Sequence, residues 1–390
     1  MKIRKSALFV AAAVILCLVL VMTIAGCTPE DKNVLKIGMV GPLTGGTAEY
    51  GIKALRGIEI AVEEANASGE LGEITLKVIS EDTEGDWSKA ANAFTKLIDV
   101  DKVDVIVGAV LSSETEAGAP IVKDSKMPTI SPTSTAEDLT KDNPYLFRNC
   151  LTDKVQVELL VDYAVEELGL GKFAILYVNN DYGVSLKDSF EAKAKKMAEV
   201  VAVESFEDKT VAFQDRLDKI KRKDPDCIFI GGYYEEAAKI AQQAKERDLD
   251  VQILGADGLT NEALIEIGEE AVEGTYATSG FFPDEPTPEV QNFVTVYKEK
   301  HDEIPDMFAA QAYDAARIVI ETIKNQGVTL EDIENGTASA LIREGIAATK
   351  DFPGISGKTS LDEEGEAIKN AFILKVEGGK FILAKSPVDN

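Results

Sequence analysis

The stretch VDVIVGAVLSSETEAGAPIVKDSKMPTISPTST (residues 103–135) predicts two strands of a parallel sheet, each followed by a turn rich in hydroxyl side chains. Residues 103–107 are apolar except for Asp104, as in a buried strand, and a helix is expected to open near Ser113. Residues 128–130 predict the second strand. In an open α/β sheet, ligands bind outside the carboxyl ends of the strands, near the point where strand order reverses. We therefore expect a ligand site at these two turns.

The side chains at both turns suit a small anion. Backbone N–H groups at a helix start are unpaired and carry partial positive charge, so Ser112, Ser113 and the amides after them fit a carboxylate. Ser131, Thr133, Ser134 and Thr135 follow the second strand and would face the same cleft. The alternative is that these residues are ordinary helix N-caps, a common role of serine and threonine at helix starts.

Strands and amphipathic helices alternate through most of the chain, which predicts an α/β protein with parallel sheets covered on both faces. The pattern restarts near Cys150, so two lobes of the same class are expected. Residues 275–289 are rich in proline and are expected to form a loop. Further helices are predicted at 290–300, 307–324 and 338–346, and a final hairpin at 371–376 and 380–383.

The first 26 residues predict an export signal. Lys2, Arg4 and Lys5 precede an apolar run over residues 7–22, and small residues follow before Cys27. The segment TIAGC resembles the lipobox of bacterial lipoproteins, which implies cleavage before Cys27, lipidation of that cysteine and a linker over residues 27–33. The alternative is an uncleaved membrane anchor, because the apolar run is nearly long enough to span a bilayer. Both interpretations tether the body of the protein outside the cytoplasm.

Composition and charge narrow the class of protein. The 390 residues are 45% hydrophobic and 28% charged, which is typical of a globular chain long enough for two lobes. A net charge of -27 repels nucleic acid and anionic headgroups, so no nucleic-acid partner is expected. Cys150 and Cys227 are the cysteines of the body; they could pair outside the cell, but their apolar surroundings favour buried free thiols.

The sequence offers little for catalysis, metals or cofactors. Its one histidine, His301, lies in a charged helix end, which leaves a histidine-based metal site or triad without most of its parts. The acidic residues 81–86 lack the ligand order of a calcium loop, and the glycine-rich turn 41–46 lacks a nucleotide fingerprint. We therefore expect a protein that is not an enzyme and that has neither a cofactor nor a metal site.

Hydroxyls, aromatic rings and one acid follow successive predicted strands, and this set suits a zwitterion. Serine and threonine hydroxyls with helix-end amides can hold a carboxylate, while an acid can hold an ammonium group. Tyrosine can cover an apolar side chain and donate its O–H. The residues of this set are Tyr50, Ser112, Ser113, Ser134, Thr135, Tyr182, Tyr233 and Asp257, and the apolar Leu111 beside Ser112 is the ninth candidate for the site.

Seven segments carry a family resemblance: KIGMVGPLTGGTAEYG, GAVLSSET, PTISPTST, NNDYG, IFIGGYYEEAA, ILGADG and FAAQAYDAARI. In this order they resemble the solute-binding proteins of branched-chain amino acid ABC importers, which have the type I periplasmic-binding-protein fold. The resemblance implies two Rossmann-like lobes joined by three crossovers, placed near Asn149, Thr278 and Ser356. Lobe 1 would then hold residues 34–149 and 279–355, and lobe 2 residues 150–278 and 356–390.

The resemblance also implies roles for the candidate residues. Ser112 and Thr135 would hold the ligand carboxylate, and the backbone of Ser134 would contribute there and to the ammonium group. Tyr233 and Asp257 would reach the amino acid from lobe 2, with Asp257 standing where leucine-binding members carry glutamate. Tyr50 and Tyr182 are expected to shape the side-chain pocket. Leu111 lies beside the carboxylate corner, as does Glu114, whose charge there calls a purely aliphatic ligand into question.

These expectations combine into one function. The chain is predicted to be a monomeric, membrane-anchored lipoprotein of the cell envelope that captures leucine, isoleucine, valine or a similar small amino acid. It would deliver this ligand to the permease and ATPase subunits of an ABC importer. Two alternatives stay open: a ligand-sensing binding protein for small amides or acids, and an extracellular enzyme on the same scaffold.

Overall fold

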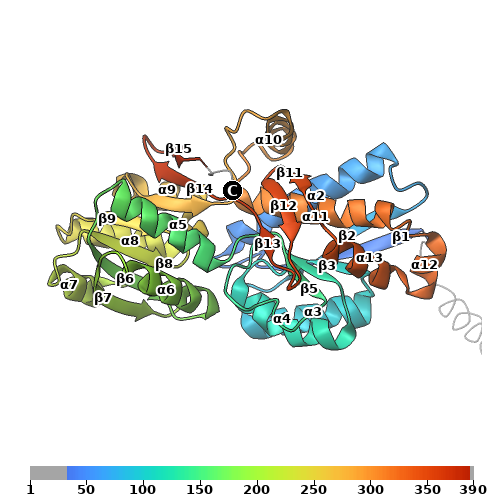
Figure 1. Ribbon diagram of the computed structural model, residues 1–390, viewed down its shortest axis with the longest axis horizontal. Helices are drawn as coiled ribbons and strands as arrows, with labels where there is room; N and C mark the ends of the chain where they lie inside the picture. The colour runs from blue at the N-terminus through green and yellow to red at the C-terminus, as the bar shows by residue number, and fades with distance from the viewer. Residues whose placement is uncertain (1–32, 387–390) are drawn as a thin grey trace, which may run out of the picture.

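The computed structural model describes residues 33–386, which form two lobes side by side, each built on its own β-sheet (Figure 1). The first sheet is wholly parallel, in the order β2-β1-β3-β4-β5. Its strands are β1 (Val34–Gly41), β2 (Thr75–Asp82), β3 (Val105–Val107), β4 (Thr129–Ser131) and β5 (Leu146–Arg148). The prediction of an α/β fold with parallel sheets is confirmed.

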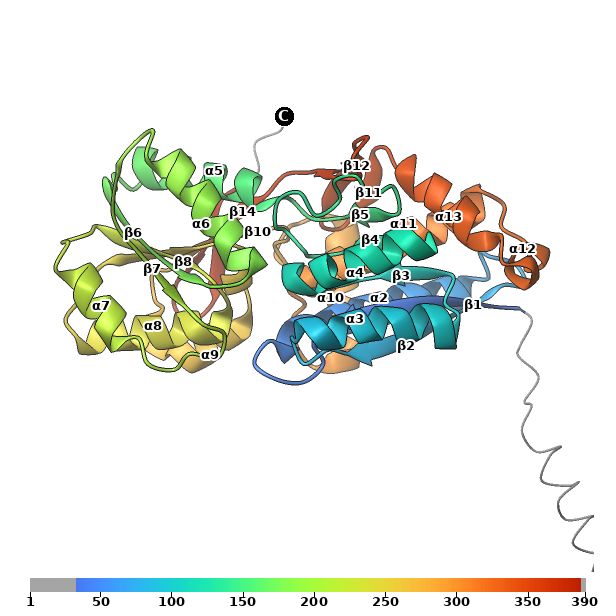
Figure 2. The ribbon, with the colours of Figure 1, turned by 90° about the horizontal axis from the view of Figure 1, so that it is seen from below.

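Helices cover both faces of the first sheet, because side chains on a strand point alternately to opposite faces. Val105 and Val107 belong to the core that includes α2 and α11, whereas Ile106 packs with Phe94 and Val122 from α3 and α4. Figure 2 shows α3 and α4 together along one side of this lobe. The helices of lobe 1 are α2 (Ala48–Ser68), α3 (Trp87–Lys96), α4 (Ser112–Ser125), α10 (Pro288–His301), α11 (Met307–Asn325), α12 (Leu330–Asn335) and α13 (Ala338–Ala347).

Helices α2 and α11 pack unusually closely. A Cβ atom added at Gly57 would lie 2.1 Å from the carbonyl oxygen of Ala309 and would clash with it, so only glycine fits at this position. This close contact fixes the start of α11 against α2. Both helices reach the boundary between the lobes, where they carry Phe308 and Tyr50.

The second sheet has the order β15-β14-β10-β9-β8-β6-β7, with an antiparallel pair at one edge. Its strands are β6 (Lys172–Val178), β7 (Glu199–Phe206), β8 (Cys227–Gly231), β9 (Gln252–Gly255), β10 (Tyr276–Ser279), β14 (Phe372–Val376) and β15 (Phe381–Lys385). Its helices are α5 (Asp153–Glu166), α6 (Asp181–Ala194), α7 (Gln214–Lys221), α8 (Tyr234–Glu246), α9 (Glu262–Gly268) and the short 3-10 turns η2 (Asp257–Leu259) and η3 (Glu269–Ala271). The predicted hairpin of β14 and β15 is confirmed.

Several short elements were not predicted. Residues 275–289 were expected to be a loop, but this was wrong for β10, which pairs with both β9 and β14. Its four residues gave no recognisable alternation, and its pairing on both edges stabilises it instead. Helix α12 and the small antiparallel sheet of β11 (Phe352–Gly354), β12 (Gly357–Leu361) and β13 (Ala367–Ile368) were also missed.

The chain passes between the two main sheets after β5, after β10 and before β14. The predicted lobe boundaries stay predictions. The contacts favour a different position only for the third crossover, which was expected near Ser356. The turn before β13 binds lobe 1, because Arg148 N donates to Gly365 O at 3.0 Å and Thr140 Oγ1 donates to Glu366. Sheet membership therefore favours a third crossover near Lys369 over one near Ser356.

The predicted state of the two body cysteines is confirmed, since Cys150 and Cys227 are both buried and free. The predicted signal, the lipidation site Cys27 and nearly all of the linker lie outside the described residues. Among residues 33–386, every helix is too short or too polar to cross a membrane.

Candidate functional site

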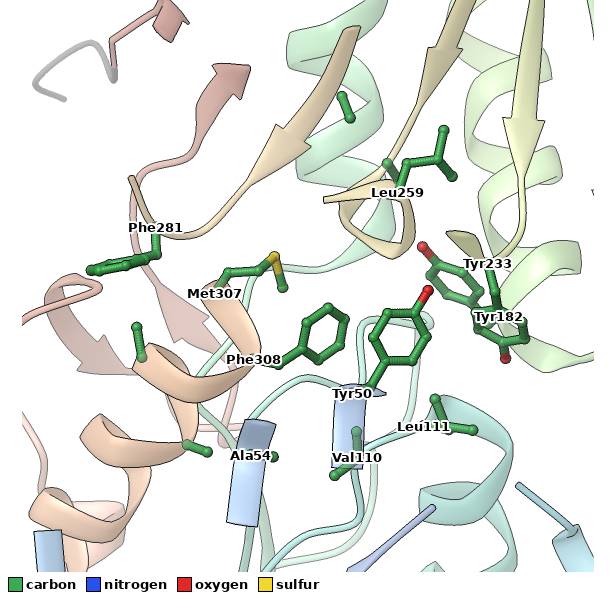
Figure 3. Packing of buried hydrophobic residues seen from close by; sticks show 14 of the residues in the cluster. Tyr50, Ala54, Val110, Leu111, Tyr182, Tyr233, Leu259, Phe281, Met307 and Phe308 are labelled. Carbon is green, nitrogen blue, oxygen red and sulfur yellow. The ribbon is translucent and has the colours of Figure 1, made fainter. Parts of the chain in front are cut away.

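A small cavity of about 20 Å³ lies between the lobes, close to the carboxyl ends of β3, β4, β8 and β9. This is space for one or two water molecules. Figure 3 shows Tyr50 from lobe 1 facing Tyr182 and Tyr233 from lobe 2. The cavity is lined by Tyr50, Val110, Leu111, Ser112, Thr133, Tyr182, Tyr233, Asp257, Gly258 and Phe308. Six of the nine predicted site residues are therefore brought together here.

Tyr50 bridges the two lobes. Its hydroxyl donates to the carbonyl oxygen of Gly258 at 2.5 Å and accepts from the backbone N–H of Tyr234 at 3.0 Å. Its ring stacks on Phe308 with centroids 4.2 Å apart. Burial raises the pKa of Tyr50 well above its usual value, so its hydroxyl keeps its proton and acts as a donor. These bonds hold the lobes in contact at the cavity.

Asp257 lies at the end of β9, in the turn η2. Its Oδ1 accepts from the Tyr182 hydroxyl at 2.7 Å and from the N–H of Gly258 at 2.9 Å, and its Oδ2 accepts from Gln156 Nε2 at 3.3 Å. Burial raises the pKa of Asp257, and these hydrogen bonds partly offset that effect. All three partners belong to lobe 2, so this acid is oriented before any contact with lobe 1.

Tyr233 is oriented by two neighbours. Its ring is nearly parallel to that of Tyr182, with centroids 5.4 Å apart and an interplanar angle of 11°. Its hydroxyl accepts a hydrogen bond from Asn180 Nδ2 at 3.1 Å. Tyr233 precedes the first residue of α8, so its position follows from the turn between β8 and that helix.

The predicted carboxylate corner is bound together by Ser112. Its Oγ accepts hydrogen bonds from the N–H groups of Thr135 and Ala136, both at 3.2 Å. Ser112 thus joins the turn after β3 to the turn after β4, and its hydroxyl proton is left to donate into the cavity. Thr135 itself lies behind Ser112 and does not line the cavity.

Ser134 and Ser113, which were also expected at the site, do not line this cavity. The Ser134 carbonyl, expected to help bind an ammonium group, accepts from Arg148 Nη1 at 3.1 Å and from Cys150 Sγ at 3.2 Å. Ser113 lines a neighbouring cavity that shares Leu111 and Tyr233 with the first.

Glu114, expected to influence specificity, is buried behind the corner. Its carboxylate accepts from the Thr83 hydroxyl and from the N–H of Leu111, the residue that precedes α4. Burial raises the pKa of Glu114 to about 7 despite these bonds. Its contacts are those of a glutamate that binds back to the start of its own helix, and a structural role explains them.

Thr133, expected to face the cleft, lines the cavity, whereas three other lining residues were not predicted from the sequence: Val110, Gly258 and Phe308. Val110 and Gly258 each adjoin a predicted residue and could have been included by that proximity. Phe308 opens the segment FAAQAYDAARI, which carries the family resemblance, but it was given no role at the site. It lies far beyond the corner in sequence and reaches the cavity only through the packing of α11 on α2.

Asp153 is a further missed residue, and it is buried at the start of α5 beneath Thr135. Three buried oxygen atoms have no hydrogen-bond partner in the described part of the chain: both carboxylate oxygens of Asp153 and the hydroxyl oxygen of Thr135. Burial and the neighbouring Asp257 charge raise the pKa of Asp153 to about 8, although Ser185 and Thr135 lie close enough to lower it somewhat. Asp257 lines the cavity and Asp153 does not, but the two acids, both with raised pKa values, are close enough to interact.

Asp153→Asn is expected to raise the stability of the ligand-free protein at pH 8 by about 2 kcal/mol, and much less at pH 4. The folded state binds a proton at Asp153 up to about pH 8, whereas the unfolded state releases it near pH 4. Wild-type stability at this site therefore falls as pH rises between these values, and the amide removes that loss. Urea unfolding of both proteins across the pH range measures the difference. An equal difference at both pH values would mean that Asp153 does not titrate as described.

Known proteins match the chain over nearly its whole described length. A family model for periplasmic binding proteins matches residues 34–380. The Leu/Ile/Val-binding protein BraC3 of Rhizobium johnstonii is 29% identical over 357 residues, which cover 90% of this chain and 94% of that protein. The leucine binding protein LivK of Thermotoga maritima is 32% identical with a TM-score of 0.84, covering 91% of this chain and 99% of that one.

A second solved structure is equally similar. The branched-chain amino acid transporter substrate binding protein LivJ of Streptococcus pneumoniae, in complex with isoleucine, is 32% identical with a TM-score of 0.84. The match covers 92% of this chain and 100% of that one. Together with the two sheets and the interlobe cavity, this likeness defines a two-lobed solute-binding protein.

The chain belongs to the periplasmic binding protein family. The resemblance found in the sequence is therefore confirmed. Members of this family bind solutes outside the cytoplasm, which gives the chain an extracytoplasmic location.

Proposed function

We propose that this protein is the solute-binding component of an ABC importer and captures a branched-chain or related small amino acid between its lobes. Asp257 is the observation that carries this proposal. It is the one charged side chain among the described residues that line the cavity, and it is an acid. A buried acid without a cationic partner favours a ligand that brings a positive charge, as the ammonium group of an amino acid does.

The other lining groups support the same ligand class. The Ser112 hydroxyl and the N–H groups at the start of α4 suit the carboxylate of the amino acid. Behind the lining residues, the Asp153 carboxylate and the Thr135 hydroxyl have no hydrogen-bond partner among the described residues, although neither side chain lines the cavity itself. Tyr50, Phe308 and Val110 offer an apolar surface for a short side chain.

Ligand entry requires the lobes to separate. The cavity is smaller than any branched-chain amino acid, and Tyr50 closes it by its bond to Gly258. A ligand would enter an open form, contact lobe 1 through Ser112, and then be enclosed when lobe 2 returns with Tyr233 and Asp257. A ligand can drive such a hinge motion only by binding the closed form better than the open one.

The proposal includes the attachment and partners expected from the sequence. Export followed by lipidation at Cys27 would tether a monomer to the outer face of a membrane. The importer would supply permease and ATPase subunits. Labelling with a radioactive fatty acid, with Cys27→Ser as control, tests the anchor: label on the variant would exclude Cys27 as the site.

Thermal melting tests the ligand class. The body from Asp31 onward is expected to melt at a higher temperature with leucine, isoleucine or valine, because a ligand at 100 times its dissociation constant adds about 2.7 kcal/mol of stability. The other amino acids and a panel of simple acids and amides serve as comparison. No shift with any amino acid, for folded protein freed of bound ligand, would contradict the proposal.

One alternative keeps a specific observation in its favour. Burial raises the pKa of Asp257, because it disfavours the charged form, and this direction also suits an uncharged ligand such as a small amide. A sensor of small amides is therefore the second candidate. A simple carboxylic acid fits less well, because its charge would face Asp257 without an ammonium group between them.

A further inference from the structure

We propose that Asn261 and Asp306 form a latch between the lobes that stabilises the closed, ligand-holding form. This inference rests on the proposed function, because it concerns how a bound solute is retained. Asn261 Nδ2 donates to Asp306 Oδ2 at 2.9 Å. Asn261 belongs to lobe 2 and Asp306 to lobe 1, so this hydrogen bond crosses the cleft.

Each latch residue is held in place by its own helix. Asn261 precedes α9, and its Oδ1 accepts from the N–H of Ala263 at 2.9 Å. Asp306 precedes α11, and its Oδ1 accepts from the N–H groups of Phe308 and Ala309 at 2.9 and 3.1 Å. Each side chain caps a helix with one atom and presents the other atom to the opposite lobe. The bond therefore requires little further ordering of side chains when the lobes meet.

The latch is coupled to the cavity through both of its ends. The turn that leads into Asn261 begins at Asp257, and its Gly258 carbonyl accepts from Tyr50. Phe308, which hydrogen-bonds to Asp306, stacks on the same Tyr50. Figure 3 shows Phe308 beside Tyr50, with the turn that carries Leu259 on the lobe 2 side. A lobe movement that brings Asp257 onto a ligand thus also brings Asn261 onto Asp306.

The charges around the latch favour closure as well. Lys53 is buried in lobe 1, with its Nζ 3.1 Å from Glu303. Its positive charge also acts on Asp306 and on Glu262 of lobe 2, and it lowers the pKa of both acids against the stronger, raising effect of burial. Glu303 of lobe 1 has the smaller, opposite effect on Glu262, so Lys53 attracts this first residue of α9 to lobe 1 where the latch forms.

The chain permits a substitution that breaks the latch and keeps both helix caps. Asn261→Asp retains a good N-cap but faces Asp306 with a second carboxylate, which should repel. The exchange Asn261→Asp with Asp306→Asn restores one amide and one carboxylate, in swapped positions. Asp86→Asn makes the same acid-to-amide change as Asp306→Asn, but at the N-cap of α3 and outside the latch, and is the control for that half of the exchange.

Stopped-flow measurement on the full-length protein, with leucine, isoleucine and valine as probes, should separate closure from first contact. Asn261→Asp is expected to speed ligand dissociation by roughly tenfold or more while the association rate stays within about threefold. The exchanged pair should return dissociation close to the wild-type rate, and Asp86→Asn should not change it. Wild-type dissociation in Asn261→Asp, or fast dissociation that the exchange does not rescue, would overturn the latch.

If the wild-type protein binds none of these amino acids, that result counts against the proposed function and not against the latch. A second measurement tests the latch without a ligand. Val100→Cys and Val211→Cys give one exposed labelling site in each lobe, and the native body cysteines are buried. The interlobe distance in ligand-free protein should lengthen in Asn261→Asp and return in the exchanged pair. An unchanged distance in all three proteins would exclude the latch.

Discussion

Asp257→Ala is expected to abolish most amino acid binding while the protein stays folded. Removing the acid leaves the ligand ammonium buried without a partner, and truncating one member of a buried charge pair costs about 2 to 5 kcal/mol, a loss of roughly 30-fold or more in affinity. Folding should not suffer, because burial already raises the pKa of Asp257 and its ionisation opposes folding. Titration calorimetry of ligand binding, with urea unfolding of the same samples, measures both effects.

Asp257→Asn is the matched control, because it keeps the shape of the side chain and an acceptor for Tyr182 but removes the charge. An amino acid ligand should lose affinity with both variants. A neutral amide ligand should lose affinity with alanine and retain most of it with asparagine. Wild-type affinity in Asp257→Ala would show that this acid does not contact the ligand at all.

The parallel parts of the fold could be predicted from sequence because they rest on local signals. Apolar runs such as residues 227–230 mark buried strands, and Asp86 marks the start of α3, where it accepts from the N–H of Lys89. β10 and the sheet of β11, β12 and β13 could not be predicted in this way. Their strands are two to five residues long and are stabilised by partners distant in sequence.

The residues of the candidate site also fall into those that local sequence signals predict and those that they do not. Ser112, Tyr233 and Asp257 follow strand ends, and parallel strands bring such ends to one edge of a sheet, so their proximity could be expected. Phe308 could not be found in this way, because the packing of α11 on α2 decides its position. Asp153 was missed because its burial beneath Thr135 arises only in the folded chain. The role of Glu114 was also hidden, since its contacts with Thr83 and Leu111 exist only in the folded chain.

Arg148 is expected to be the residue whose loss most damages both stability and the site. It is buried almost completely, with its Nε donating to Glu366. Its Nη1 donates to the carbonyl oxygens of Ser134 at 3.1 Å and Ala136 at 2.7 Å. One guanidinium group therefore holds the turn after β4, which positions Thr135 against Ser112, and ties that turn to the segment before β13.

Arg148→Met should lower the free energy of unfolding by about 3 to 5 kcal/mol, because Glu366 then keeps its charge without a cationic partner in a mostly buried position. Urea unfolding of the ligand-free protein measures this loss. Arg148→Met with Glu366→Gln should recover part of the stability, since no unpaired charge remains. Ligand affinity should stay low in both variants, because neither restores the bonds to Ser134 and Ala136. Full recovery of affinity in the double variant would mean that Arg148 affects ligand binding through its ion pair with Glu366, and not through its hydrogen bonds to Ser134 and Ala136.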